Sequence, residues 1–235
     1  MRHEFATPDP PRLRVSVPAG RIEIETGPRT DTIVEIEGRD VEEFGVEQRG
    51  REIVVERRKR FGRAGGSYDV RILAPEGADA ELALASADVR GTGRFGEVRV
   101  RNASGDVQLG SVGGRLDVST ASGDVVVQAA TGGGAIRTAS GDVVVREAGE
   151  RLGVMTASGD LVIAAIANGA LDLKSASGDM RIGIAPGSRF HVDARSLSGE
   201  TRSDLEILGV ETTTEGPLVE LKATSMSGDI RIVRA

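Results

Sequence analysis

The chain contains no cysteine and no tryptophan, and it has a single tyrosine, Tyr68. Without cysteine, neither a disulfide framework nor a thiolate metal site can form. Aromatic residues make up only 3% of the 235 residues, whereas glycine occurs 32 times and hydrophobic residues reach 39%. The core must therefore consist mainly of Val, Ile, Leu and Ala, and β-branched side chains of this kind pack well on a pleated sheet.

Long apolar runs are absent as well. No segment approaches the roughly 18 consecutive apolar residues of a membrane span, and residues 1–11 lack the apolar core of a signal peptide. We therefore expect a cytoplasmic protein with no transmembrane segment. The net charge of −6 argues against specific nucleic-acid binding, because phosphate neutralisation requires a basic face.

The most informative feature is an internal repeat. The octapeptide TASGDVVV occurs at residues 120–127 and again at residues 138–145, and near-copies of its SGD core occur elsewhere. The serines that align on this motif are Ser86, Ser104, Ser122, Ser140, Ser158, Ser177, Ser198 and Ser227. Their spacing is 18 residues four times, and then 19, 21 and 29. A fixed period of this length indicates a repeat architecture.

Apolar residues alternate with polar ones on both sides of each motif, but the alternation changes phase across it. Leu116 and Val118 precede Ser122 at even positions, whereas Val125 and Val127 follow it at odd positions. A straight strand would turn one of these sets toward water. Ser-Gly-Asp therefore marks a corner, at which glycine adopts the required backbone conformation at little steric cost. The predicted structural corners are Ser104, Gly105, Asp106, Ser122, Gly123, Asp124, Ser140, Gly141, Asp142, Ser158, Gly159, Asp160, Ser177, Gly178, Asp179, Ser227, Gly228 and Asp229.

Glycine or asparagine turns, such as Gly132–Gly134, provide a second break in each repeat. Two short strands and two turns in 18 residues are too short for a βαβ crossover and correspond to one coil of a parallel β-solenoid. We predict an all-β, single-chain parallel β-helix. Residues 1–11 are expected to be a disordered tail, 12–79 a β-rich cap or degenerate coils, and 80–235 the regular solenoid, with 12–235 as one continuous domain.

The polar residues of the repeat have structural interpretations. Thr120, Thr138 and Thr156 occupy the inward column before the corner, where stacked hydroxyls can bond to one another and to corner amides. The aspartates stack about one strand spacing apart, and the repulsion of roughly 1 kcal/mol per pair in water can be offset if each accepts a hydrogen bond from a turn N–H.

The SGD corners, together with RLRVSVPAGRIEIETG at residues 12–27 and YDVRILAPEGADAELALASADV at residues 68–89, resemble the DUF4097 family of bacterial β-strand-repeat proteins, whose members are often labelled adhesins. The resemblance covers nearly the whole chain. It implies a right-handed β-helix without catalytic residues. Because family members are often attached to membranes or linked to envelope stress, it also implies a protein or envelope partner.

Catalytic and cofactor sites are disfavoured by the residues themselves. A Ser-His-Asp triad needs a positioned base, and the only histidines are His3, in the expected tail, and His191, at an outward position. A glycan-cleaving enzyme would need aromatic side chains for sugar stacking. A calcium β-roll places Asp two residues after glycine, whereas here Asp follows glycine directly. We therefore predict no enzymatic activity, no cofactor and no bound metal.

The places where the repeat fails are the remaining candidates for function. A basic loop contains Arg57, Arg58, Lys59, Arg60 and Arg63, which could bind an acidic partner or could be only a solvated loop. A second irregular segment spans Ser203–Pro217, and the chain reaches Ala235 directly after a full coil. An uncapped coil exposes unpaired backbone groups.

Two functions follow from these features. The first is a structural or assembly protein, a homo-oligomer that self-associates through coil ends or sheet faces. The alternative is an adhesin-like or envelope-stress-related module that binds a protein, lipid or glycan.

Overall fold

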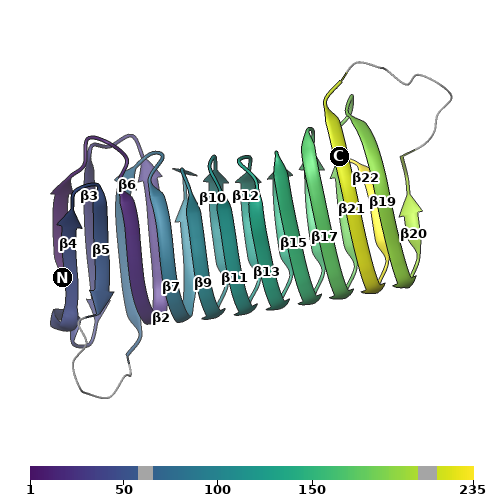
Figure 1. Ribbon diagram of the computed structural model, residues 1–235. Coiled ribbons are helices and arrows are strands. Elements are labelled where there is room, and N and C mark those ends of the chain that lie inside the picture. Colours follow the sequence, from purple (N-terminus) through teal and green to yellow (C-terminus); the bar gives the residue numbers. More distant parts are fainter. Residues whose placement is uncertain (58–65, 206–215) are drawn as a thin grey trace. The chain divides into compact units, whose positions relative to one another are not determined.

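The computed structural model describes residues 1–57, 66–205 and 216–235 (Figure 1). The chain divides into two compact units, residues 1–122 and residues 123–235. The described residues are mainly β-strand, and within those ranges the one helical element is the 3-10 turn η1 (Val41–Glu43). No helix in the described ranges is long and apolar enough to span a membrane.

The described residues of the first unit, 1–57 and 66–122, form eleven strands in addition to η1. They are β1 (Arg2–Ala6), β2 (Arg12–Gly27), β3 (Asp31–Gly38), β4 (Phe44–Arg49), β5 (Glu52–Arg57), β6 (Tyr68–Pro75), β7 (Asp79–Thr92), β8 (Arg94–Phe95), β9 (Val98–Ser104), β10 (Val107–Val112) and β11 (Leu116–Ser122).

Two long strands, β2 and β7, each contribute to two ladders of the first unit. The amino-terminal half of β2 pairs with β5 on one side and β7 on the other, and its second half lies between β6 and β7. β9 and β11 continue the first ladder, and β10 continues the second and also pairs with β8. All of these pairings are parallel. The pairing of β2 with β7 joins the segment predicted as a cap, residues 12–79, to the first regular coil.

Antiparallel strands form the outer part of the first unit. β4 pairs with β5, β3 with β6, and β1 with β3, all antiparallel. The predicted disordered tail is therefore wrong for residues 2–6, which form β1. His3 and Phe5 are its half-buried residues, and their rings stack with centroids 6.2 Å apart. Only two positions of this segment are half-buried, and its partner β3 lies more than 20 residues away in the sequence.

In the second unit, eleven strands also occur within residues 123–205 and 216–235. They are β12 (Val125–Ala130), β13 (Gly134–Ser140), β14 (Val143–Ala148), β15 (Arg151–Ser158), β16 (Leu161–Ile166), β17 (Gly169–Ser177), β18 (Met180–Ile184), β19 (Arg189–Ser198), β20 (Thr201–Ser203), β21 (Leu218–Ser227) and β22 (Ile230–Arg234).

These strands form two parallel ladders, in which each coil contributes one strand to each ladder. The order is β13, β15, β17, β21, β19 in one ladder and β12, β14, β16, β18, β22, β20 in the other. Equivalent residues face each other, so Ser140 pairs with Ser158 and Thr138 with Thr156. This confirms the predicted parallel β-solenoid.

The stacking order of the coils differs from their order in the sequence. β21 lies between β17 and β19 (Figure 1), and β22 lies between β18 and β20. The coil that ends at Ala235 is therefore an inner coil, and the Ala235 N–H donates a hydrogen bond to the Ile184 carbonyl at 3.0 Å. The prediction that this coil is uncapped is wrong. We call the coil formed by β19 and β20 the outer coil of the second unit.

The core of each unit consists of the inward columns that the phase of the alternation predicts. Leu116 and Val118 are buried in the first unit, and Val125 and Val127 in the second. Because each column continues from coil to coil, a coil is stable only when it is covered by its neighbours.

Candidate interaction site

The glycines of the SGD corners adopt a conformation that other residues rarely adopt. Gly141, Gly159 and Gly178 have φ angles of 126°, 130° and 125°. A Cβ built on Gly159 would lie 2.2 Å from the Gly141 carbonyl oxygen, and one on Gly178 would lie 2.2 Å from the Gly159 oxygen. Both the positive φ and the close approach of the preceding coil require glycine. The repeated glycine is therefore explained by coil stacking.

The corner aspartates form a ladder of hydrogen bonds between coils. Asp124 Oδ1 accepts the backbone N–H of Asp142 at 2.9 Å. The same bond, at 2.8 Å in each case, joins Asp142 to Asp160, Asp160 to Asp179, Asp179 to Asp229, and Asp229 to Glu200. Each bond offsets the repulsion between stacked carboxylates.

The inward hydroxyls before the corners also have structural partners. Thr120, Thr138 and Thr156 donate to the carbonyl oxygens of Ser122, Ser140 and Ser158 at 2.9, 3.0 and 3.2 Å. The acceptors are thus corner carbonyls two residues along the chain, rather than the corner amides considered from the sequence. These hydroxyls serve as hydrogen-bond donors within the corners.

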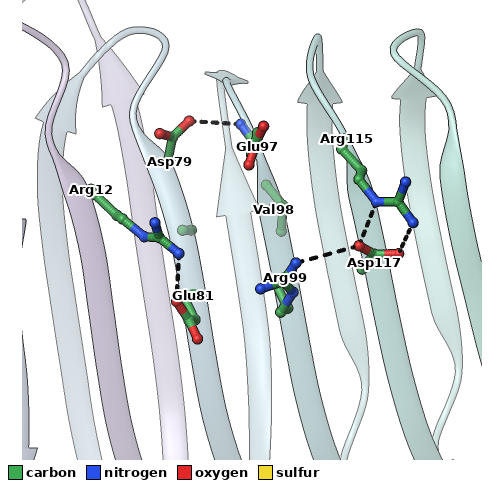
Figure 2. Close-up of a pocket in the computed structure, with 9 residues that line it drawn as sticks. Arg12, Asp79, Glu81, Glu97, Val98, Arg99, Arg115 and Asp117 are labelled. Carbon is green, nitrogen blue, oxygen red and sulfur yellow. Dashed lines mark hydrogen bonds and ion pairs between the residues drawn. The ribbon is translucent and has the colours of Figure 1, made fainter.

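A lattice of alternating charges covers part of the surface of the first unit (Figure 2). Arg12 bonds Glu81 at 2.8 Å, and Arg115 Nε lies 2.7 Å from Asp117 Oδ2. The bond to Glu81 raises the pKa of Arg12 above its ordinary value, and the bond to Arg12 lowers the pKa of Glu81. Asp79 Oδ1 accepts the Glu97 N–H at 2.8 Å. Arg12 with Glu81 and Arg115 with Asp117 therefore compensate one another's charge within this surface.

The basic loop lies almost entirely outside the described residues. This applies to Arg58, Lys59, Arg60 and Arg63.

Arg57, which is described, has structural contacts. Its guanidinium donates to Glu43 Oε2 at 2.6 and 2.9 Å and lies 5.9 Å from the centre of the Tyr68 ring. The bond to Glu43 raises the pKa of Arg57. Arg57 therefore joins the end of β5 to η1.

The two histidines lie in different units. His3 stacks on Phe5 in the first unit, whereas His191 is exposed on β19 in the second. Within the described parts of the chain, no three His, Cys, Asp or Glu side chains are grouped so that they could hold a metal ion.

The outer coil of the second unit is the feature that differs most from the rest of the repeat. Among the described residues, β19 pairs only with β21, and β20 pairs only with β22. The inward positions of β19 continue the buried core columns, but Phe190 is 45% exposed, and Val192 and Ala194 are only half-buried. The outer coil therefore presents both a strand edge and part of the core.

Exposed apolar side chains gather at the same place. Six large hydrophobic side chains are exposed in the described ranges, and four of them lie on β19 or on its neighbour β21. These four are Phe190, Leu197, Leu218 and Met226. Leu197, the most exposed at 82%, lies in the register position next to Met226, which is 60% exposed. We call β19, β20 and these side chains the open edge.

Sequence reasoning missed the open edge because it assumed that the coils stack in sequence order. One residue of the sequence differs in a way that fits the observed order. Each inner coil of the second unit has Asp at the corner, where a carboxylate accepts an N–H from the following coil, but the coil with Ser198 has Glu200 instead. Only the outermost coil can dispense with this acceptor, and SGD at Ser227 marks an inner coil.

The parallel ladders and SGD corners place the protein in the class of β-solenoid repeat proteins. The Toastrack DUF4097 family model matches residues 12–233. The chain therefore belongs to the Toastrack DUF4097 family.

Two solved bacterial structures are similar to this chain. A protein of Bacteroides fragilis described as a "putative adhesin" has a TM-score of 0.52 and 10% sequence identity, covering 99% of this chain and 96% of that chain. A second "putative adhesin", from Parabacteroides distasonis, has a TM-score of 0.44 and 10% identity, covering 98% of this chain and 96% of that one. No curated protein sequence matches the chain. The similarity to the first structure supports the fold.

Proposed function

We propose that this Toastrack protein is a non-enzymatic assembly module that self-associates by adding a β-strand to its open edge. The observation that carries this proposal is that β19 has a hydrogen-bonded neighbour on one side only among the described residues, while the core columns beneath it are half-exposed. Strand addition supplies backbone hydrogen bonds and covers apolar side chains in a single step.

The composition of the open edge supports association. Soluble proteins commonly protect sheet edges with lysines, prolines or bulges. β19 has no lysine and no proline, and it pairs without a register shift over its length. Full burial of a side chain such as Leu197 contributes on the order of 2 kcal/mol, so partial burial of these side chains adds to the backbone hydrogen bonds of an added strand.

The second candidate function is adhesin-like binding of another protein at the same edge. The fold shared with the "putative adhesin" of Bacteroides fragilis favours keeping this candidate. In this case the added strand would come from a different chain, and the protein would remain monomeric when pure.

Light scattering of the full chain over a range of concentrations tests the proposal. We expect the mean mass to rise with concentration. Arg189 donates its N–H to the Pro217 carbonyl on the β21 side. Because successive residues of a strand point their N–H groups to opposite sides, the N–H of Ala194 points away from β21, to the open edge. Ala194→Pro should therefore prevent strand addition while leaving the bonds to β21 in place, with little change in Tm.

Arg195→Pro is the matched control. The N–H of Arg195 points toward β21, so proline at this position removes a bond between β19 and β21 and should lower Tm. A full-length protein that remains a monomer at every concentration, without change on Ala194→Pro, would contradict self-association.

A further inference from the structure

The backbone groups at the open edge define which residues can pair with an added strand. Alternate residues of a strand point their N–H and C=O groups to opposite sides. The Arg189 N–H donates to the carbonyl of Pro217, which directly precedes β21. The backbone groups of the odd-numbered residues of β19 therefore face β21, and those of the even-numbered ones face outward from the edge. Phe190, Val192, Ala194 and Ser196 therefore present the edge-facing backbone groups among the described residues.

The outward side chains limit the possible registers for two copies of β19 that pair antiparallel around a two-fold axis. Asp193 and Arg195 both lie on the outward face, where Arg195 Nε is 2.9 Å from Asp193 Oδ1. An axis at Asp193 places two aspartates directly opposite, and an axis at Arg195 places two arginines opposite. Like charges directly opposite destabilise a strand pair. An axis at Ala194 instead places Asp193 of each copy opposite Arg195 of the other.

An axis at Val192 is also disfavoured. It would pair His191 with Asp193, but it would place Arg189 of each copy opposite Arg195 of the other. It would also shorten the overlap of the two strands, because Ala194 lies closer to the middle of β19 than Val192 does. The Ala194 axis is therefore the register in which charge and overlap agree.

We propose that the partner at the open edge is a second copy of this chain, with the two β19 strands antiparallel and the two-fold axis at Ala194. This inference rests on the proposed function and adds a partner, an orientation and a register to it. Homodimers with two-fold symmetry present the same surface twice, as this arrangement requires.

The proposed register is consistent with the hydrogen-bonding directions. Ala194 faces Ala194 of the second copy, and Val192 faces Ser196, so all of these residues point their backbone groups across the new interface. These pairs supply about six backbone hydrogen bonds. Asp193 and Arg195 then form non-hydrogen-bonded pairs, in which opposite Cα atoms are about 4.5 Å apart and side chains approach closely.

The same register covers the half-exposed inward column of β19. Val192 and Ala194 of one copy meet Ser196 and Ala194 of the other, so the core columns continue across the axis as they do from coil to coil within the unit. On the outward face, Leu197 lies opposite His191 of the second copy.

Cysteine crosslinking tests the register, and the natural chain has no cysteine to interfere. Full-length Asp193→Cys and Arg195→Cys variants are prepared separately and then mixed under mild oxidation. The Ala194 axis brings position 193 of one copy within disulfide distance of position 195 of the other. We expect the mixture to give a disulfide-linked heterodimer, and each variant alone to give at least about fivefold less crosslinked dimer.

The possible failures can be told apart. If Asp193→Cys crosslinks to itself, or Arg195→Cys crosslinks to itself, as efficiently as the mixture, another register is present and the inference is overturned while self-association survives. If light scattering shows dimers but none of the samples crosslinks, the dimer uses a different surface and the inference fails. If the unmodified chain is monomeric throughout, both the inference and the self-association proposal fail.

Exchanging the two charges provides a second test of the register, one that does not depend on thiol chemistry. Asp193→Arg alone should weaken dimerisation by about tenfold, because it places arginines opposite one another at two positions. The double variant Asp193→Arg with Arg195→Asp should restore wild-type dimerisation. If the single and double variants are equally weakened, the proposed register is wrong. Thermal unfolding of all variants serves as the control, and we expect these substitutions on the outward face to leave the fold intact.

Discussion

The two units of the chain differ in how their outermost strands pair with the strands inside them. In the first unit, antiparallel strands are added outside the parallel coils, and β1 and β4 are the outermost strands of the two ladders. In the second unit, the outermost strands β19 and β20 are parallel copies of the inner ones. The first unit therefore changes its pattern of pairing at its edge, and the second keeps the pattern unchanged.

The difference shows that the end of a repeat is determined by local residues rather than by chain position. In the first unit, β1 carries Arg2 and Glu4 on its exposed side, and Arg2 pairs with Glu35 of β3. In the second unit, β19 retains a surface that would fit one more coil. In both units, however, strands from farther inside the sequence cover the coil that lies nearest to the end of the sequence. β5 and β6 lie outside β2, and β19 and β20 lie outside β21 and β22.

A disulfide test of the coil order in the second unit has the largest expected effect, because disulfide formation is close to all or none. Lys222 lies between Asp172 on one side and Asp193 on the other. The double variant Asp172→Cys with Lys222→Cys should crosslink within one chain, since adjacent strands are about 4.8 Å apart. Asp172→Cys with Asp193→Cys should not crosslink, because these positions are about two strand spacings apart.

Lys222→Cys with Asp193→Cys is the positive control, because these strands are neighbours in either order. Non-reducing electrophoresis and mass spectrometry of dilute protein measure the intramolecular bond. Efficient crosslinking of positions 172 and 193, with none between 172 and 222, would show that the coils stack in sequence order and would remove the contrast between the two ends.

A comparison of inner and outer glycines should give the next largest effect. Gly159→Ala places a side chain at φ 130° and against the Gly141 carbonyl, so we expect it to cost about 3 kcal/mol and to lower Tm by about 10 °C. Gly199 lies in the outer coil and its φ is not positive. Gly199→Ala should cost about 1 kcal/mol, because this coil can shift outward from Gly228. Equal losses in thermal unfolding would mean that the outer coil is held as tightly as an inner one.

The corner carboxylates should give the smallest difference. Asp179→Ala removes the acceptor for the Asp229 N–H, and we expect a loss of about 1 kcal/mol in the free energy of unfolding. Glu200→Ala removes only a surface ion pair with Arg202, so its cost should stay near about 0.3 kcal/mol. Chemical denaturation measures both variants. The interpretation of Glu200 as the end of the ladder would be lost if its removal were as costly as that of Asp179.

Much of the fold could be predicted from the sequence because it repeats a local rule. Every coil must meet the same packing conditions, so the phase of Leu116 and Val118 against Val125 and Val127 identified both strands and the corner. Glycine at positions such as Gly159 was predictable for the same reason, since only glycine fits that corner. The sequence alone could thus define the coil, its period and its buried face.

The stacking order could not be predicted in the same way, because strands of similar pattern fit beside one another in more than one order. β17, β19 and β21 all carry inward apolar columns and a serine before the corner. The choice among them depends on contacts between segments far apart in the chain. Glu200 and the exposed Phe190 and Leu197 are the residues that distinguish the outer coil, and their meaning becomes clear only once the neighbouring strands are known.

The inserted coil also has a consequence for folding during synthesis. The ribosome makes the segment Arg189–Ser203 before the segment Leu218–Arg234, yet β19 and β20 pair only with β21 and β22 among the described residues. Growth of the stack therefore cannot follow the order in which these segments emerge. The outer coil must wait without its native neighbour until the inner coil has left the ribosome, and the segment Leu218–Arg234 then closes two interfaces at once.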